Sequence, residues 1–411
     1  MKPVRRIEPS DWMRADETRA VIAALAAEGQ EVRFVGGCVR DALHARKESD
    51  GIDIDIATPD RPEQVIQLLD KAGIKNIPTG LSHGTITAVV NHKHFEITTL
   101  RVDVETHGRH ADVAFTDDWE EDAARRDFTM NAMFCSSEGD IYDPWGGIAD
   151  LEAGRVRFVG DAAKRIEEDH LRLLRFFRFH AWYGKGEPDA DGLKAAADWA
   201  TSLVKLSGER IRAEMLKLLA APEPEPVVDV MAGAGVLAEA VPGAGDGKIL
   251  RALVSLEEQA DPLRRLAALS RPVGDAAALA ARLRLSRAEQ DRLTALLAPP
   301  EIIATGMDER AQRRVLYRHG AERVTDWLML DQAERGGPAE GIAAALAAVR
   351  EWRPVELPVK GADALALGME AGPEVGEAIR AVEDWWIDED FAPGREACLE
   401  KLRETVAAHA S

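Results

Sequence analysis

Residues 36–41 read GGCVRD and residues 53–55 read DID, and these two motifs decide the expected fold. Two aspartates two positions apart on a strand point to the same face, where their carboxylates can hold divalent cations. A glycine pair at a turn lets backbone amides approach a phosphate group, and Arg40 adds a forked donor for phosphate oxygens. The pattern indicates two-metal phosphoryl-transfer chemistry, although an Asp-x-Asp strand is also typical of a solvated sheet face.

The first third of the chain mixes strand and helix signals. The helix expected at Pro62–Ala72 has a proline in its first turn, where the missing N–H costs least. A hairpin is expected to turn near Asn91. The expected strands are Val32–Val35, Ile52–Ala57, Thr85–Val90, His94–Leu100 and Ala132–Ser136. This mixture predicts a compact α+β domain.

From Asp161 onward, Ala- and Leu-rich stretches with three-to-four spacing dominate and predict helices, for example at 276–285 and 341–349. Proline-rich breaks at 221–226, 299–300 and 353–358 indicate joints between helical parts. The expected fold class is therefore α+β, a small mixed sheet followed by all-α domains. The expected domains are a catalytic head at 1–150, a helical neck at 151–222, and a helical body and tail at 223–411.

Composition alone argues against a nucleic-acid-binding protein. The 411 residues carry a formal net charge of −20, and only residues 151–220, with 13 Lys and Arg against 11 Asp and Glu, are not acidic. Any RNA contact must therefore use local basic faces. Three scattered cysteines without CxxC spacing, no long apolar run and no signal-peptide pattern lead us to expect a cytoplasmic protein that crosses no membrane.

Two further segments can contribute to the site. Glu96, in a plausible neighbouring strand, is a candidate third catalytic carboxylate, and it fits an exposed strand position equally well. Arg126 is a candidate phosphate ligand, while Asp127 and Asn131 either face a ribose or hold the loop in shape. The arginines before Asp127 also fit a helix end, where cations stabilise the helix dipole.

The segment from Glu168 to Phe179 reads EDHLRLLRFFRF. After Asp169 its basic residues recur every three positions, which on a helix gives a drifting stripe opposite an expected core of Leu171, Leu174 and Phe177. The plainer interpretation is a basic helix face with an i,i+3 ion pair between Asp169 and Arg172. Residues 209–212 open another helix that is expected to support the first.

Taken together, these motifs resemble the class II tRNA nucleotidyltransferase family of the polymerase-β-like superfamily, which includes CCA-adding enzymes and bacterial poly(A) polymerases. The resemblance is dense from about residue 31 to residue 220, and a later one lies in residues 360–376. It rests on seven motifs in the family order: FVGGCVRDAL, DIDIA, FEITTLR, RRDFTMNAMF, DPWGG, EEDHLRLLRFFRF and GERIRAEMLKLL.

The resemblance implies a role for most of the candidate residues. It implies that Asp53 and Asp55 bind Mg²⁺, and that Lys360 and the Gly372 turn lie in the tail, where tRNA phosphates could be held. The residues expected to contact the nucleotide are Gly36, Gly37, Arg40, Arg126, Asp127, Asn131, Asp169, Arg172, Arg175 and Arg178. The expected partners are the tRNA 3′ end, CTP and ATP, and oligomeric state is left open.

A physical argument supports the base-selecting role of Asp169 and Arg172. Cytosine and adenine both present an amino donor beside a ring-nitrogen acceptor, which a carboxylate and a guanidinium complement. Uracil and guanine present a carbonyl and an N–H instead, and each buried mismatch costs about 1–3 kcal/mol. One acid–arginine pair can therefore accept CTP and ATP without a nucleic-acid template.

The function that the resemblance implies is addition of C, C and A to the tRNA 3′ end from CTP and ATP, with release of pyrophosphate. Three alternatives compete with it. A poly(A) polymerase, or a partial enzyme adding only CC or only A, shares the head motifs and differs in loops such as Val102–Ala124. Within that range the acidic stretch 117–122 is interpreted as a mobile loop that changes the nucleotide specificity between C and A. An inactive RNA-binding relative is disfavoured by the complete set of site residues. A His-Asp phosphohydrolase is disfavoured because residues 221–411 contain no His-Asp dipeptide.

Overall fold

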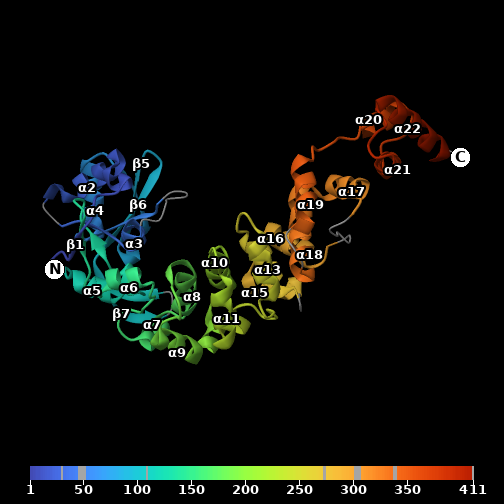
Figure 1. The fold of residues 1–411 in the computed structure, drawn as a ribbon. Coiled ribbons are helices and arrows are strands. Elements are labelled where there is room, and N and C mark those ends of the chain that lie inside the picture. Colours follow the sequence, from blue (N-terminus) through green and yellow to red (C-terminus); the bar gives the residue numbers. More distant parts are fainter. Residues whose placement is uncertain are drawn as a thin grey trace. The chain divides into compact units, whose positions relative to one another are not determined.

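The computed structural model describes residues 1–28, 31–44, 52–107, 110–271, 275–299, 307–336 and 340–409 (Figure 1). Its contacts divide the chain into two compact units, and each is described separately. The first comprises residues 1–246 and 277–285, and the second comprises residues 247–276 and 286–411. In the described residues, no helix is long and apolar enough to cross a membrane.

An eight-stranded mixed sheet organises the first unit. Its order is β1-β10-β9-β2-β3-β6-β5-β4, and β3 with β6 is the parallel pair among otherwise antiparallel neighbours. The strands are β1 (Arg5–Arg6), β2 (Arg33–Val35), β3 (Ile54–Thr58), β4 (Lys75–Gly80), β5 (Thr85–Val90), β6 (Lys93–Thr99), β9 (Phe134–Cys135) and β10 (Asp140–Tyr142). The expected mixed sheet is thus confirmed.

Local sequence explains the hairpin between β5 and β6. Asn91 and His92 both have positive φ, 47° and 65°, as a tight primed turn requires, and asparagine tolerates this conformation well. The expected strand at Ala132–Ser136 is shorter than predicted, because only Phe134 and Cys135 pair with β2 and β10. Asp53 lies one residue before β3 rather than within it.

Helices cover the sheet of the first unit. The blue helices α2 and α4 lie side by side in Figure 1, and α4 also packs against β4 and β5. The helix predicted at Pro62–Ala72 is confirmed as α4. The helices of eight residues or more in this unit are α2 (Asp16–Leu25), α4 (Pro62–Lys71), α8 (Leu171–Tyr183), α9 (Ala190–Asp198), α10 (Gly208–Leu219), α11 (Glu225–Gly233) and α15 (Ala276–Leu283).

The short helices and 3₁₀ turns of the first unit complete the framework around the sheet. They are α1 (Asp11–Arg14), η1 (Ala26–Glu28), α3 (Gly37–Leu43), η2 (Leu81–His83), α5 (Trp119–Ala124), η3 (Thr129–Asn131), α6 (Gly147–Ala153), α7 (Ala162–Glu168), η4 (Ala200–Lys205) and α12 (Val236–Ala240).

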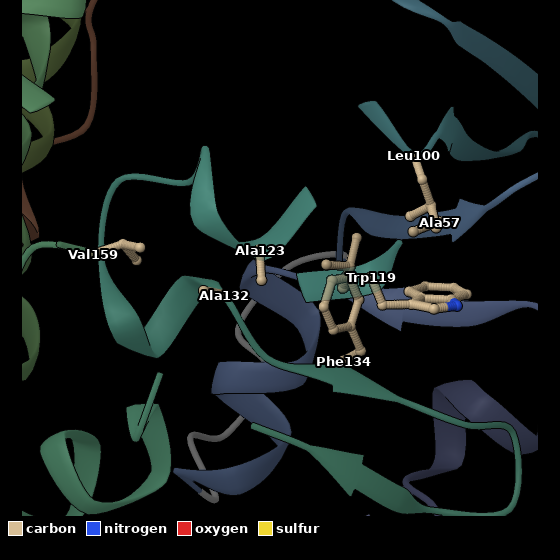
Figure 2. Packing of buried hydrophobic residues seen from close by; sticks show 8 residues of the cluster. Ala57, Leu100, Trp119, Ala123, Ala132, Phe134 and Val159 are labelled. Carbon is tan, nitrogen blue, oxygen red and sulfur yellow. The ribbon is translucent and has the colours of Figure 1, made fainter. Parts of the chain in front are cut away.

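A cluster of buried hydrophobic residues joins strand β3, which carries Asp55, to helix α5, which directly precedes Arg125 and Arg126. Figure 2 shows Trp119 against Phe134, with ring centroids 5.0 Å apart in an edge-to-face arrangement. Ala57 of β3 and Ala132, which follows η3, belong to the same cluster. The residues of the cluster are Val35, Ala57, Leu100, Trp119, Ala123, Ala132, Phe134 and Val159.

Residues 119–122 of the acidic stretch belong to helix α5, so the prediction of a loop over 117–122 is wrong for all but Asp117 and Asp118. The Asp118 carboxylate accepts a hydrogen bond from the Glu120 amide and caps α5. Trp119 and Asp122 are buried in the domain, 8% and 1% exposed. Aspartate at an N-cap and acidic residues in the first turn both favour helix formation. Upstream, β7 (Arg101–His107) and β8 (His110–Phe115) form a separate two-stranded sheet.

The core face of α8 also differs from the prediction. Leu174 and Phe177 are buried as expected, but Leu171 is half-buried and faces a cleft. Leu173 and Phe176 take its place in the core. The helix begins at Leu171, so Asp169 lies outside it, whereas Arg172, Arg175 and Arg178 of the basic stripe all lie within it.

In its described residues, the second unit contains helices and no strand. Its helices are α13 (Lys248–Leu256), α14 (Pro262–Ser270), α16 (Arg287–Leu297), α17 (Glu309–His319), α18 (Ala321–Arg335), α19 (Glu340–Glu351), α20 (Gly361–Ala366), α21 (Pro373–Asp388) and α22 (Arg395–His409). Lys360 directly precedes α20, and Gly372 directly precedes α21.

Buried ion pairs hold four of these helices together. The Asp326 carboxylate, 1% exposed, accepts hydrogen bonds from Arg264 at 2.9 Å and from Arg292 at 2.8 Å. Arg264 and Arg265 both reach Glu257. The unit boundary near residue 246 does not test the predicted divisions at 150 and 222, which stay predictions.

Replacing Trp119 by Ala should lower the free energy of unfolding by about 3 kcal/mol, because it leaves a cavity against Phe134. Thermal and urea unfolding of the variant measure this loss. Trp119→Phe is the matched control and should cost less, since a ring still meets Phe134. Equal stability of Trp119→Ala and the wild type would contradict the role given to this cluster.

Candidate functional site

The carboxylates of the DID motif lie beside a third one. Asp55 on β3 pairs in parallel register with Glu96 on β6, which places the two side chains on adjacent strands. Burial raises the pKa of Asp55 to about 6, and the negative charges of Glu96 and Asp53 add to this against the opposing effect of Arg126. Asp53 and Glu96 are both exposed. Such mutual repulsion is relieved when a cation binds.

The donor set fits Mg²⁺. Within the described residues, no three potential metal-ligating side chains already converge on one point. Mg²⁺ commonly takes one or two carboxylates and completes its shell with water and substrate phosphates, so Asp53 and Asp55 suffice. Carboxylate oxygens are also the hard ligands that this ion prefers.

The glycine turn faces these carboxylates. Gly36 has φ +76°, a left-handed conformation that strains any residue with a Cβ, and it leads into α3. A Cβ placed there would lie 3.6 Å from Arg126 Nη1 and 3.7 Å from Asp55 Oδ2. The glycine turn, the Arg126 guanidinium and the Asp55 carboxylate therefore meet at one place.

A ring of hydrogen bonds begins and ends on α8. Arg175 Nε donates to Asp127 Oδ2 at 2.7 Å, and Asn131 Nδ2 donates to Asp127 Oδ1 at 3.0 Å. Arg40 Nη1 donates to Asn131 Oδ1 at 2.6 Å and its Nε donates to Asp41 Oδ1 at 3.0 Å. The hydroxyl of Tyr183, at the end of α8, donates to the same oxygen of Asp41 at 2.8 Å. We name these six residues the α8 ring.

Charge stabilises the α8 ring from within. Burial by itself would raise the pKa of Asp127, but the ion pair with Arg175 and the hydrogen bond from Asn131 outweigh it and lower the pKa to about 2. Asp127 is therefore ionised at neutral pH despite being 8% exposed. The sequence left open whether Asp127 faces a ribose or holds its loop in shape. Its hydrogen bond from Asn131 shows that it holds the loop in shape.

Asp122 positions the two arginines that follow α5. Its Oδ1 accepts from Arg125 Nη2 at 2.7 Å and its Oδ2 accepts from Arg126 Nη2 at 2.9 Å. Burial would raise the pKa of Asp122, but these two arginines outweigh it and lower the pKa. Sequence reasoning missed this role, although the i,i+3 and i,i+4 spacing of the three residues could have signalled it.

The predicted i,i+3 ion pair between Asp169 and Arg172 is wrong. Asp169 accepts instead from Arg210 Nη2, at 3.0 Å and 2.8 Å to its two oxygens. Arg172 donates to Glu168 Oε2 at 2.5 Å and to the carbonyl of Arg125 at 2.9 Å. Because Asp169 is extended and precedes α8, the helical spacing that would bring the pair together does not apply.

Helix α10 supports α8 as predicted, through Arg210 of the predicted segment and through Glu214, which the prediction did not name. The buried Glu214 accepts from Arg178 Nε at 2.5 Å and lies 4.0 Å from Arg175 Nη1. Arg210 on the same helix holds Asp169. Glu214 and Arg178 lie 36 residues apart on different helices, so no local spacing signalled this contact.

One cleft of about 1410 Å³ collects the residues predicted to be catalytic or to contact the nucleotide, with the exception of Glu96. The predicted residues that line it are Gly36, Gly37, Arg40, Asp53, Asp55, Arg126, Asp127, Asn131, Asp169, Arg172, Arg175 and Arg178. The cleft thus joins a carboxylate pair, a glycine turn and several arginines. That arrangement suits a polyphosphate ligand held beside a metal ion.

Proteins similar to this chain match most of its length. It is 35% identical over 390 residues to "CCA tRNA nucleotidyltransferase 1, mitochondrial" of Danio rerio, covering 91% of this chain and 88% of that protein. A CCA-adding enzyme of Streptococcus gordonii is 29% identical over 414 residues, with 96% and 98% covered. The chain belongs to the class II CCA-adding tRNA nucleotidyltransferase family.

Family descriptions and a solved structure agree with this membership. Residues 32–157 match the "Poly A polymerase head domain" and residues 188–246 match the "Probable RNA and SrmB- binding site of polymerase A". The crystal structure of the Bacillus stearothermophilus CCA-adding enzyme in complex with CTP is 28% identical, with a TM-score of 0.77 and coverage of 96% of this chain and 98% of that one. The predicted family and fold class are confirmed.

Asp127→Asn should weaken the acid dependence of stability. A carboxyl whose pKa is lowered in the folded state stabilises it above the unfolded pKa and loses that contribution as pH falls through the folded pKa. Wild-type stability should therefore fall by about 2 kcal/mol more than that of Asp127→Asn between roughly pH 4 and pH 2. Urea unfolding at several pH values measures the difference. Parallel pH profiles would contradict the ionised state of Asp127.

Proposed function

We propose that this member of the family adds C, C and A to the tRNA 3′ end from CTP and ATP, without a nucleic-acid template and with release of pyrophosphate. The observation that carries the proposal is the shared cleft, in which Asp53 and Asp55 face the same space as Asp169 and Arg172. Relatives named as CCA-adding enzymes that cover most of this chain support it.

Mg²⁺ is the proposed metal, held by Asp53 and Asp55. When bound, it would lower the pKa of the attacking RNA hydroxyl and neutralise charge on the phosphates. Glu96 is proposed to act beside them as a third carboxylate, because its register opposite Asp55 brings its charge close.

The protein's own residues supply orientation. Gly36, Gly37 and Arg126 are proposed to contact the triphosphate, since the turn and the Arg126 guanidinium meet next to Asp55. Asp127 and Asn131 would present the ribose side of the pocket in the geometry of the α8 ring. In place of the predicted direct phosphate contact, we propose that Arg40 positions Asn131, because its donors lie on Asp41 and Asn131.

Base selection is proposed to reside at the start of α8. The Asp169 carboxylate is held by Arg210 and by the Leu171 amide at 3.1 Å, so it is ordered before a base arrives. Arg172 lies in the same cleft. Arg175 and Arg178 are proposed to line the pocket behind them, oriented by Asp127 and Glu214.

The remaining expectations are also proposals. We propose the division into head, neck, and body with tail at 1–150, 151–222 and 223–411, with the boundary at 150 falling within α6. We also propose that Lys360 and Gly372 lie on the RNA-facing part of the tail. A cytoplasmic location is proposed from cysteine usage, whereas the name of the Danio rerio relative places that protein in mitochondria.

The nearest alternatives are enzymes that add only CC or only A, or a poly(A) polymerase. One experiment separates them from full CCA addition. The protein is incubated with Mg²⁺, labelled CTP or ATP, and tRNAs that lack the last three, two or one nucleotides of CCA. We expect each tRNA to be completed to CCA and then to stop. An unbounded A tract, or addition of A only to CC-ended tRNA, would favour the alternatives.

Asp55→Asn and chelation of divalent cations are the matched controls for this reaction. Each should reduce addition by at least about a thousandfold, because the metal would supply several kcal/mol of transition-state stabilisation. Binding of tRNA by Asp55→Asn should persist. Wild-type rates in the variant would contradict the proposed metal site.

Asp169→Ala should relax base selection. Without the carboxylate, CTP and ATP lose an acceptor for their amino groups and UTP loses a repulsive partner, so the ratio of kcat/KM for CTP over UTP should fall about tenfold or more. Steady-state incorporation of each nucleotide measures the ratio. Full discrimination against UTP in this variant would make the proposal wrong.

A further inference from the structure

The segment Glu8–Arg14 forms a wall of the cleft that no motif marked. Glu8, Pro9, Ser10, Asp11, Trp12 and Arg14 line the same space as Asp53 and Asp55. None of them belongs to the residues assigned to the nucleotide, which come from α3, the start of β3, the Arg126–Asn131 segment, Asp169 and α8. The segment also precedes residue 32, where the match to the head-domain family begins.

This wall is rigidly attached to the catalytic sheet. Strand β1 pairs with β10, and the Ile7 amide donates to the carbonyl of Gly139 at 2.9 Å. The Trp12 ring meets Phe34 edge-on with centroids 4.8 Å apart, and Phe34 lies on β2 just before the glycine turn. The Thr18 hydroxyl donates to the Trp12 carbonyl at 2.7 Å. The wall is therefore a preformed part of the site.

Two donors on the wall lack strong partners. In the described part of the chain, the indole Nε1 of Trp12 has no hydrogen-bond partner, although the residue is only 8% exposed. Buried donors are seldom left without an acceptor, so this one points to a ligand. Arg14 donates to Glu8 at 2.5 Å, but their side chains are 49% and 88% exposed. An exposed ion pair of this kind contributes little free energy, so Arg14 can leave Glu8 and bind a phosphate instead.

The reaction itself requires a second ligand in this cleft. Transfer to an RNA end needs the nucleotide and the RNA 3′ terminus on the metal pair at the same time. A pocket for one small ligand is about 300–1,000 Å³, and this cleft of about 1410 Å³ exceeds that range. Single-stranded RNA ends are commonly bound by a cation on the phosphate together with an aromatic side chain.

We propose that the Glu8–Arg14 wall binds the 3′-terminal nucleotides of the tRNA, with Arg14 on a backbone phosphate and Trp12 Nε1 donating to the same segment. This inference rests on the proposed CCA addition. Glu8 and Asp11 make the wall acidic apart from Arg14, so the wall contributes one phosphate contact and not a general basic surface.

The test measures binding of CC-ended tRNA to the full-length protein over a range of salt concentrations. Arg14→Ala should raise the Kd about tenfold. It should also reduce the slope of log affinity against log salt by about 0.7, the value for one contact to a single strand. The KM for CTP should not change. Trp12→Phe, which keeps the packing on Phe34 and removes the N–H, should raise the Kd about threefold to tenfold.

Arg19→Ala is the matched control, since Arg19 is exposed on α2 and does not line the cleft. It should leave the salt slope unchanged, while Arg14→Lys should retain most of it. Thermal unfolding verifies that the variants are folded. Wild-type tRNA affinity and salt slope in Arg14→Ala would overturn the inference, as would a raised KM for CTP with unchanged tRNA binding. A wild-type protein that fails to extend tRNA would instead reject the proposed function.

Discussion

The buried ion pair between Asp127 and Arg175 is the interaction on which the arrangement of the cleft depends. It links the segment after α5 to α8, and from it the α8 ring continues through Asn131, Arg40 and Asp41 back to Tyr183. A buried charge must be paired and hydrogen-bonded to be tolerated, so each member constrains the next. The ring thereby holds α3, the segment from Asp127 to Asn131 and α8 in one geometry.

The same principle resolves the conflict between an acidic protein and a polyanionic substrate. Most arginines in the cleft are held by a carboxylate: Arg126 by Asp122, Arg172 by Glu168, Arg178 by Glu214 and Arg210 by Asp169. Part of the net charge of −20 thus orders cations that face the substrate. Preorganised donors cost little reorganisation when a ligand arrives, which suits recognition of phosphates and of a base edge. The carboxylates at Asp53, Asp55 and Glu96 differ, because they repel one another, and the proposed Mg²⁺ would relieve that repulsion.

Local patterns predicted much of this molecule. The β5–β6 hairpin, the helix α4 and the glycine turn follow from alternation, from a proline in a first helical turn and from glycine at positive φ. Predictions failed where a contact overrode the local pattern. The stretch 117–122 has the composition of an acidic loop. However, Trp119 packs in a hydrophobic core and Asp122 accepts hydrogen bonds from two arginines, and these contacts stabilise a helix from Trp119 onward. Leu171 is only half-buried, because it is the first residue of α8.

By itself, the sequence determined which chemical groups are present and, for the DID carboxylates and the glycine turn, how they face one another over a few residues. Backbone periodicity is enough for that, because neighbouring residues share one strand or one turn. The tertiary structure decided the pairings between distant segments: Arg210 rather than Arg172 for Asp169, Glu214 for Arg178, and the Glu8–Arg14 wall beside Asp53. Such contacts depend on which charges are buried together when the helices pack, and spacing along the chain carries no information about that.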